Sequence, residues 1–214
     1  MEETTSREKV LKKLRNALIS QTENPYPSLD LTSSVYKEFN ETLDITFATE
    51  FSKVAGKFIY CEDEKDLQEN LISLIGEKKW ENIFCLEPGI KETLAEAGIP
   101  FVSLEKEFSK MDAGITYCEY LIARLGSIMV SSKQTSGRRL NVFPENHIVI
   151  AKSSQIVADL KDALKNIKEK YVNNLPSMIS VITGPSRTAD IEKTLVMGAH
   201  GPRELYVFLI DEEK

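Results

Sequence analysis

From Gly56 onward, short apolar runs alternate with amphipathic segments, and this alternation constrains the fold more than any other feature of the chain. The apolar runs have the length of β-strands, and the segments between them carry apolar residues at helical spacing. Strands that alternate with helices build a parallel sheet with helices on its faces. The sequence therefore predicts a three-layer α/β/α fold around a mostly parallel central sheet. In the first part of this region, strands are expected at residues 57–62, 82–87 and 99–104, and helices at residues 63–79 and 88–98.

The alternation continues in the second half of the chain, and a different pattern precedes Gly56. Before Gly56, one amphipathic helix is expected near the start, where Val10, Leu11, Leu14 and Leu18 share a face. We therefore expect an N-terminal helical arm with a linker over residues 1–55 and one α/β domain over residues 56–214. In the second half, strands are expected at residues 127–132, 147–151, 177–183 and 204–210, and a helix at residues 153–171.

Charge and hydropathy narrow the classes of partner. The 214-residue chain has a net charge of −6, so its mean field repels nucleic acid and anionic membrane surfaces. The sequence shows no apolar run long enough to cross a bilayer and no leader pattern at its start. We expect neither nucleic acid nor a membrane as partner, and a cytoplasmic location.

Cysteine and histidine usage argues against a metal site in this chain. The three cysteines, Cys61, Cys85 and Cys118, are far apart in the sequence and form no Cys-x-x-Cys pair. Cys61 and Cys85 lie within apolar runs, which predicts buried thiols. An iron–sulfur cluster takes about four thiolates, and two histidines in the whole chain make a zinc site of the common type improbable. We expect no metal site and no resident cofactor.

The segment at residues 182–202 is the most unusual in the chain, because two Gly-Pro steps bracket it between two apolar runs. We expect a turn at Gly184 and then a short helix capped by Ser186 or Thr188. A helix that begins beside the carboxyl end of a strand offers free N–H groups to an anion. The alternative is that these residues only cap the helix and shape a tight connection. The expected ligand-binding residues are Gly184, Ser186, Arg187 and Thr188, and the candidate acid–base residues are Asp190, Glu192 and His200.

A second candidate site lies in the loop between the strands expected at residues 127–132 and 147–151. Small polar residues, a glycine and two guanidinium groups can cradle a carboxylate or a phosphate. The alternative is a solvated hairpin loop with surface arginines. His147, which follows the loop, is interpreted as a hydrogen-bonded histidine rather than a catalytic base. The expected binding residues of the loop are Gln134, Ser136, Gly137, Arg138 and Arg139.

The segment that begins at Gly184 closely resembles the C-terminal signature of the LUD-domain family, the group of the lactate utilization protein C. Residues 114–132 and 136–151 resemble two further segments of that family, so the resemblance covers about residues 56–212. The signature contains Gly-Pro-Ser, a threonine, Asp-Ile-Glu and Gly-x-His-Gly-Pro. Its positions fall here on Gly184, Pro185, Ser186, Thr188, Asp190, Ile191, Glu192, Gly198, His200, Gly201 and Pro202.

The resemblance implies the three-layer α/β fold that is shared with sugar-phosphate isomerases and coenzyme A transferases. It also implies a role in the oxidation of L-lactate to pyruvate, beside two partner proteins that carry iron–sulfur clusters. The sequence departs from the family at Arg124, where family members commonly have a glutamate. A glutamate is the covalent nucleophile of the related coenzyme A transferases, so this departure weakens a transferase interpretation.

Two functions are consistent with these observations. The first is an accessory protein of an L-lactate utilization system, which acts with iron–sulfur proteins and binds a small anion. The alternative is a free-standing enzyme or binding protein for a phosphorylated or coenzyme A-linked small molecule. In that case Arg138, Arg139 and Arg187 would surround the anion. A third interpretation is a structural protein that keeps the fold without a ligand.

Overall fold

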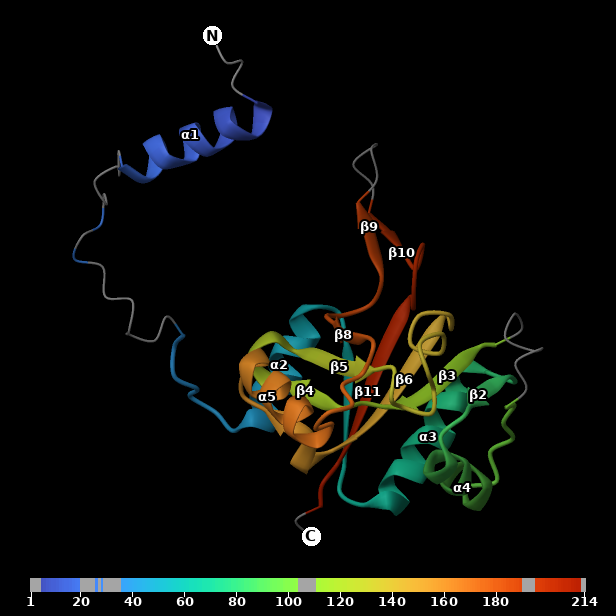
Figure 1. Ribbon diagram of the computed structural model, residues 1–214. Coiled ribbons are helices and arrows are strands. Elements are labelled where there is room, and N and C mark those ends of the chain that lie inside the picture. The colour runs from blue at the N-terminus through green and yellow to red at the C-terminus, as the bar shows by residue number, and fades with distance from the viewer. Residues whose placement is uncertain are drawn as a thin grey trace. The chain divides into compact units, whose positions relative to one another are not determined.

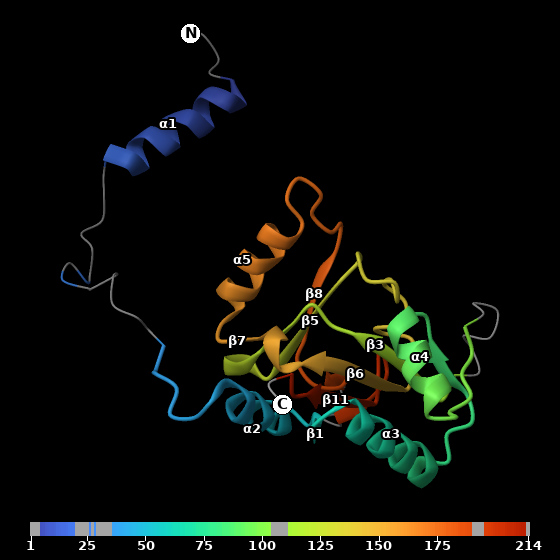
Figure 2. The same ribbon diagram turned by 90° about the horizontal axis from the view of Figure 1, so that it is seen from below.

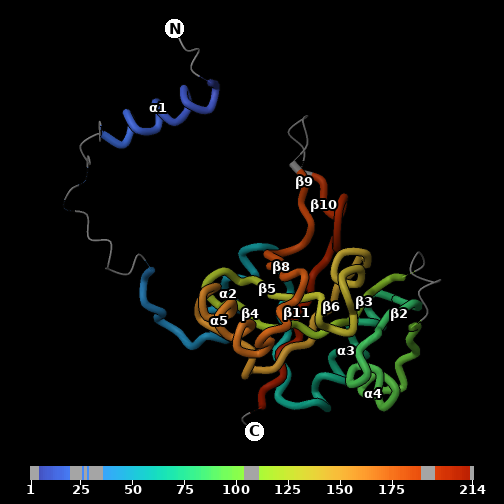
Figure 3. The backbone as a smooth tube through the Cα atoms, in the orientation of Figure 1, coloured from blue at the N-terminus to red at the C-terminus, as the bar shows by residue number. Residues whose placement is uncertain are grey.

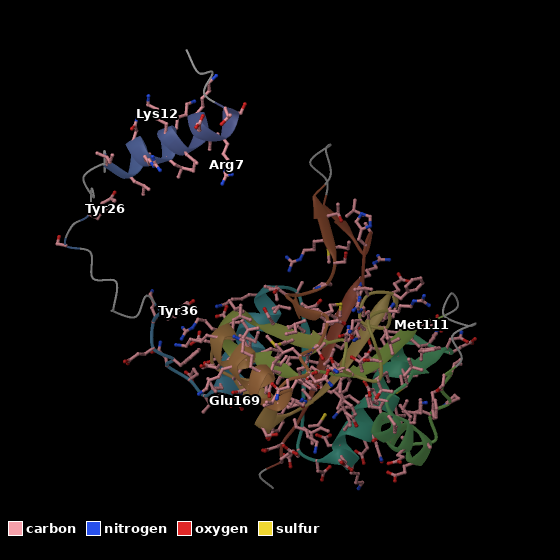
Figure 4. The ribbon with its side chains drawn as sticks, in the orientation of Figure 1. Arg7, Lys12, Tyr26, Tyr36, Met111 and Glu169 are labelled. Carbon is pink, nitrogen blue, oxygen red and sulfur yellow. The ribbon has the colours of Figure 1, made fainter. Side chains whose placement is uncertain are left out.

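A computed structural model describes residues 5–19, 26, 28, 36–103, 111–189 and 195–212 of the chain. The chain divides into two compact units, Met1–Glu38 and Phe39–Lys214. The first unit contains helix α1 (Ser6–Ile19), which confirms the expected N-terminal helix. Its start is a capping box, in which the Glu8 N–H donates to Thr5 Oγ1 (3.3 Å) and the Thr5 N–H donates to Glu8 Oε2 (2.9 Å). Figure 4 labels Arg7 and Lys12 on this helix, which has no buried residue.

The second unit is built on a five-stranded sheet in which all neighbouring strands are parallel. β11 is the last of these strands in the sequence, yet it lies between β1 and β6. Figure 3 shows β11 beside β6. Strands that are covered on both faces form nearly continuous apolar runs, and this explains the pattern of β6 and β11. The expected mostly parallel central sheet is confirmed. The strand order is β1 (Lys57–Cys61), β11 (Glu204–Ile210), β6 (Asn146–Lys152), β3 (Ala113–Tyr117) and β2 (Ile83–Cys85).

Helices α3 (Glu64–Lys78) and α4 (Pro88–Glu96) pack on one face of the parallel sheet (Figure 1). α3 begins after Asp63, whose Oδ1 accepts a hydrogen bond from the N–H of Asp66 (2.8 Å), as an N-cap does. Alternate residues of the strands point to this face, as the two-residue period of a strand requires. The residues buried here include Cys61, Leu67, Leu71, Ile83, Cys85, Ile90, Leu94, Ile115, Ile148, Ile150 and Phe208.

Helix α2 (Leu43–Lys53) and a smaller, mixed sheet cover the opposite face of the parallel sheet. The side chains of β4 and β5 again alternate, so that Leu121 and Ile128 pack toward the parallel sheet whereas Ile122 and Met129 pack outward. The α/β class is confirmed, with a small sheet added on this side of the central sheet. The smaller sheet has the order β7 (Ile156–Val157), β4 (Tyr120–Ile122), β5 (Ser127–Ser131) and β8 (Ile179–Ile182).

Helix α5 (Leu160–Lys170) covers the outer face of the smaller sheet, where Ala163 and Ile167 pack against Ile122 and Met129. Figure 2 shows α5, the smaller sheet, the parallel sheet and α3 one after another. None of the helices in the described ranges is both long and apolar enough to cross a lipid bilayer.

The division between the two units follows Glu38, whereas the sequence placed it after Ala55. Helix α2 accounts for the difference, because its residues Phe47 and Phe51 are fully buried in the core on that face of the parallel sheet which α2 covers. Gly126 lets α2 come this close: its φ is +54°, and a Cβ there would lie 2.3 Å from the backbone nitrogen of Phe51. Only glycine tolerates both the left-handed backbone and the contact.

Two expectations about single elements were wrong, and the hairpin that was left open as an alternative is not formed. The run at residues 99–104 forms no strand in its described part; Val102 makes only an isolated bridge to Phe84. The helix expected at residues 153–171 starts only at Leu160, because the preceding residues form a 3₁₀ turn and then β7, where Ile156 pairs with Leu121. The loop after β5 is no hairpin, because β5 and β6 belong to different sheets.

The expected short helix at residues 184–202 is also wrong. Strands β9 (Arg187–Ala189) and β10 (Leu195–Met197) pair antiparallel and extend away from the sheets (Figure 1). Two backbone hydrogen bonds close the base of this ribbon: the Ser186 N–H donates to the carbonyl of Pro202 (2.8 Å), and the Gly198 N–H donates to the carbonyl of Ser186 (2.9 Å). The described residues 184–189 and 195–202 therefore offer no helix N-terminus to an anion. Asp190 and Glu192 lie outside the described residues.

Candidate functional site

A cavity of about 370 Å³ lies at the carboxyl ends of strands β2, β3 and β6, and we call it the carboxyl-edge pocket. Ligands of open α/β sheets bind at this edge, where the strands end and the loops begin. Its walls bring together acidic, basic, carboxamide and phenol groups from distant parts of the sequence. The pocket is lined by Glu87, Tyr117, Cys118, Glu119, Lys133, Gln134, Thr135, Lys152, Gln155, Lys170 and Tyr171.

Strand ends place most of these side chains. Glu87 follows the end of β2 at Cys85, and Glu119 follows the end of β3 at Tyr117. Lys152 is the last residue of β6, and Gln155 comes one short turn later. Parallel neighbours end at the same edge of the sheet, so residues that are far apart in sequence meet there.

Glu119 is the most buried charged group of the pocket, with 2% of its surface exposed. A buried carboxylate is tolerated only when hydrogen bonds and opposite charge compensate it. Here Oε1 accepts from Ser131 Oγ (2.5 Å) and from the Tyr171 hydroxyl (2.9 Å), while Oε2 accepts from Lys170 Nζ (2.8 Å). Glu119 therefore ties the strand end of β3 to β5 and to the last residues of α5.

Glu119 changes the pKa values of two of its hydrogen-bond partners. Burial and the hydrogen bond to Glu119 raise the pKa of the Tyr171 phenol. For Lys170, burial lowers the pKa, but the hydrogen bond and the charge of Glu119 outweigh burial and raise it. At neutral pH the group therefore holds a protonated phenol and a charged ammonium around one carboxylate.

Glu87 is the second buried carboxylate, and a loop rather than a cation compensates it. Its Oε1 accepts a hydrogen bond from the backbone N–H of Ser136 (3.0 Å). The neighbouring phenol of Tyr117 has a raised pKa, first because of its burial and then because of nearby negative groups that include Glu87. The loop after β5 is thereby fixed to the end of β2.

Two glutamines hold the backbone around the pocket. Gln134 Nε2 donates to the carbonyl of Tyr117 (2.7 Å), and its Oε1 accepts from the N–H of Ser131 (2.8 Å). Gln155 Nε2 donates to the carbonyl of Cys118 (2.8 Å), and its Oε1 accepts from the N–H of Lys152 (2.9 Å). Each carboxamide thus joins two strand ends, so the pocket is formed without a ligand.

Two further lysines stand at the mouth of the pocket. Lys133 Nζ donates to the neutral carboxamide Oδ1 of Asn174 (2.8 Å). Lys152 Nζ forms an ion pair with Glu212 Oε1 (2.7 Å), and both side chains are partly exposed. The mouth therefore has two ammonium groups, one of which is paired with Glu212, while Glu87 and Glu119 are buried and already hydrogen-bonded.

The loop residues expected to bind a ligand are placed in different ways. Gln134 lines the pocket, and the buried Ser136 binds Glu87 through its backbone. Gly137 takes a left-handed φ of +63° at the turn that follows. Arg138 and Arg139 are exposed outside the pocket lining, and Arg138 Nη2 donates to Ser177 Oγ (2.6 Å).

The second expected group lies elsewhere. Gly184 and Ser186 form the base of the β9–β10 ribbon, Thr188 lies within β9, and the exposed Arg187 donates from Nη2 to the carbonyl of Val54 (2.5 Å). His200 is exposed and lines a cavity of about 480 Å³ before the first residues of β6 and β11, which we call the amino-edge cavity. The two cavities have no lining residue in common. The amino-edge cavity is lined by Val142, Phe143, Pro144, Glu145, Met197, Gly198, Ala199, His200, Gly201 and Arg203.

Two residues that the sequence singled out have structural roles. His147 is fully buried, its Nε2 lies 2.9 Å from Thr116 Oγ1, and burial lowers its pKa to about 4. The interpretation of His147 as a hydrogen-bonded histidine is confirmed. Arg124 Nε donates to Asp159 Oδ1 (2.5 Å), and its guanidinium lies 4.1 Å from the ring centre of Phe39. Arg124 therefore joins the loop before α5 to the start of the second unit.

The three cysteines are buried, which confirms the prediction for Cys61 and Cys85. Burial raises the pKa of each thiol to about 12. Cys61 and Cys85 lie on one face of the parallel sheet and Cys118 on the other. Within the described ranges, no three histidine, cysteine or acidic side chains are grouped so that they can hold a metal ion.

Glu119, Lys170 and Tyr171 were missed in the sequence. The run that ends in β3 was not assigned as a strand, so the polar residue at its carboxyl end had no expected position. Lys170 and Tyr171 were assigned only to an amphipathic helix. Glu87 does follow an expected strand, and the rule that ligands bind at carboxyl ends of parallel strands would have selected it.

The architecture and its carboxyl-edge pocket define an α/β protein with a mostly parallel central sheet and a preformed polar site. A DUF162 family protein from Deinococcus radiodurans has the same fold, with a TM-score of 0.60 and 19% identity over 78% of this chain and 96% of that chain. The LUD domain matches residues 46–210. The chain belongs to the LUD domain family, which confirms the resemblance found in the sequence.

Several relatives share about a third of the aligned residues. The Lactate utilization protein C 1 of Bacillus mycoides is 36% identical over 104 residues, or 48% of this chain and 44% of the relative. The Lactate utilization protein C of Bacillus subtilis is 35% identical over 109 residues, or 50% and 45%. An uncharacterized protein of Neisseria meningitidis is 34% identical over 129 residues, or 56% and 54%. The chain spans about half the length of these curated relatives.

Proposed function

We propose that this LUD domain protein takes part in lactate utilization in the cytoplasm, as an accessory protein that acts with iron–sulfur proteins in the oxidation of L-lactate to pyruvate. The observation that carries the proposal is the identity of 35–36% with relatives named Lactate utilization protein C. The preformed pocket supports a role that includes a small molecule, because small-molecule sites are cavities lined by a few fixed polar groups.

The positions of the cysteines support a division of labour with partner proteins. A cluster needs thiolates that converge on one point. Here Cys118 is separated from Cys61 and Cys85 by the sheet itself, and burial disfavours the thiolate of all three. An iron–sulfur cluster of the system would therefore be carried by a partner.

Two measurements test this function. A strain without the gene is expected to grow normally on glucose and to fail on L-lactate, and the full chain restores growth. A tagged chain isolated from the native cytoplasm is expected to bring down iron-bearing proteins in fixed proportion. Normal growth of the deletion strain on L-lactate would contradict the proposed process. A tagged chain that is isolated alone and without iron would contradict a stable complex.

The same purified chain tests the alternative function. A melting temperature that rises with a sugar phosphate or a coenzyme A ester, together with a lone chain in the pull-down, would favour a free-standing enzyme or binding protein. Arg138 and Arg139 are exposed and lie outside the lining of the carboxyl-edge pocket. These two arginines therefore form no phosphate-binding site in this pocket.

A further inference from the structure

We propose that the carboxyl-edge pocket binds a small, singly charged carboxylate, which the ammonium groups of Lys133, Lys152 and Lys170 hold at its mouth. A 2-hydroxy acid as the first compound to test rests on the proposed function in lactate utilization. The charge class of the ligand rests on the pocket alone.

The protein itself satisfies the negative charges of the pocket. Glu119 accepts hydrogen bonds from three side chains, and Glu87 accepts one from the loop backbone. The ammonium of Lys170 donates one hydrogen bond to Glu119, and an ammonium has three donors. Half of the Lys170 side chain is exposed, so its remaining donors can reach a bound anion.

The other two lysines are loosely engaged. Lys133 bonds to a neutral amide oxygen, so its charge is not cancelled by that partner. Lys152 forms a partly exposed ion pair with Glu212, and such pairs contribute little to stability. An incoming carboxylate can therefore replace or share these partners at small cost. Three lysines line this one pocket, from the loop after β5, from the end of β6 and from the end of α5, and their ammonium groups favour an anion there.

The charges of the lining limit the charge of the ligand that balances them. Three lysines, Lys133, Lys152 and Lys170, and two glutamates, Glu87 and Glu119, share the lining, so these five groups carry one net positive charge, which an anion with a single charge balances. Among the described residues that line this pocket there is no guanidinium group, the group that suits phosphate by its planar fork. The pocket therefore favours a carboxylate with one charge.

Size and rigidity agree with a small ligand. Sites for small molecules usually have volumes of about 300–1,000 Å³, and this cavity of about 370 Å³ lies near the lower end. Gln134 and Gln155 already fix the strand ends that surround it. Little ordering is then required on binding, which favours measurable affinity for a molecule that makes few contacts.

The test uses the purified full chain with four probes: L-lactate, pyruvate, acetate and inorganic phosphate. Dissociation constants are measured by NMR titration for the unaltered chain, for Lys133→Gln, and for the control Lys168→Gln. Lys168 is exposed on the same helix as Lys170 and does not line the pocket. We expect L-lactate to bind in preference to phosphate. Lys133→Gln is expected to weaken that binding about tenfold, the effect of one charge-assisted hydrogen bond, whereas Lys168→Gln leaves it unchanged.

The proposal would be overturned if none of the three carboxylates binds, or if Lys133→Gln and Lys168→Gln bind L-lactate equally. Stronger binding of phosphate than of all three carboxylates would overturn the proposal that the ligand carries a single charge. Lys133 is exposed, so its variant is expected to fold, and a melting curve without probe verifies this. The growth assay of the deletion strain is a separate test of the proposed process. A growth defect without carboxylate binding rejects only this site. Carboxylate binding without a growth defect rejects only the proposed process.

Discussion

The two edges of the parallel sheet differ in how far their polar groups are buried and hydrogen-bonded. At the carboxyl edge, Glu119 is buried and accepts three side-chain hydrogen bonds. At the amino edge, His200 is exposed, Phe143 has 61% of its surface exposed, and the side chains of Arg203 and Glu145 meet in an exposed contact of 3.5 Å. The amino-edge cavity is the larger of the two.

The difference shows that an unusual sequence and a built site need not coincide. The Gly-Pro steps of residues 184–202 are conspicuous because tight turns and a two-stranded ribbon require special backbone. The carboxyl-edge pocket consists of ordinary residues, each of which stands after an ordinary strand or at the end of a helix. Its chemistry comes from the topology that brings those residues together.

The largest expected effect is a difference in the free energy of unfolding between a variant at the carboxyl edge and a variant at the amino edge. Glu119→Ala removes the common acceptor of Ser131, Tyr171 and Lys170 and leaves a cavity, so the free energy of unfolding is expected to fall by about 3–4 kcal/mol. His200→Ala at the amino edge is expected to change it by less than about 0.5 kcal/mol. Urea denaturation of both variants measures the contrast, and equal losses would contradict it.

The two histidines extend the contrast to pH. Burial lowers the pKa of His147 to about 4, whereas an unfolded chain binds this proton near pH 6.5. The unfolded state therefore binds more protons between these values, and stability is lost as the pH falls from 6.5 to 4. The loss is expected to reach about 2–3 kcal/mol. His147→Gln should flatten this part of a pH series of urea curves, and the exposed His200→Gln should not.

A smaller difference in stability is expected between variants of two lysines on helix α5. Lys170→Met removes the cation beside the buried Glu119, and since Lys170 is half exposed the expected loss is about 1–2 kcal/mol. Lys168→Met, also on α5 and exposed, is expected to cost almost nothing. Thermal unfolding followed by circular dichroism suffices for this comparison. If both variants melt together, Glu119 does not depend on its ammonium partner.

The smallest effect concerns the attachment of the β9–β10 ribbon. Arg187→Ala removes the hydrogen bond to the carbonyl of Val54 at the end of α2, which is worth about 0.5–1 kcal/mol at an exposed position. Arg139→Ala is the matched control, because this arginine is also exposed. Hydrogen exchange of the ribbon amides should rise in the first variant alone. Unchanged exchange would show that the backbone bonds at Ser186 suffice.

Much of the fold could be predicted from local patterns. β1, α3, β2, α4, β6 and β11 are runs with clear periodicity, and they form as expected. The failures are elements that tertiary contacts decide. Ile156 and Leu160 share a helical face in the sequence, but Ile156 pairs with Leu121 of β4, and a partner so distant cannot be read from local spacing. The ribbon at residues 187–197 likewise depends on closure at Pro202.

The candidate site was less predictable than the fold. Gln134 and Ser136 were selected as polar loop residues, and the structure places them at the pocket wall and on Glu87. Their neighbours Arg138 and Arg139 point elsewhere, since a loop has no period that tells inside from outside. Glu119 could not be selected without β3 and β4, because only their ends reveal that the residue between them faces a cavity.

The place of β11 between β1 and β6 has a consequence for synthesis on the ribosome. β1 has β11 as its partner in this sheet, and the two are separated by well over a hundred residues of the chain. The edges of β1 and β6 that receive β11 therefore stay open until residue 210 has emerged. Such late, long-range pairing folds slowly and leaves apolar edges exposed to other chains. A nascent chain stalled before Glu204 is expected to recruit chaperones strongly, and one released beyond Ile210 is expected to lose them.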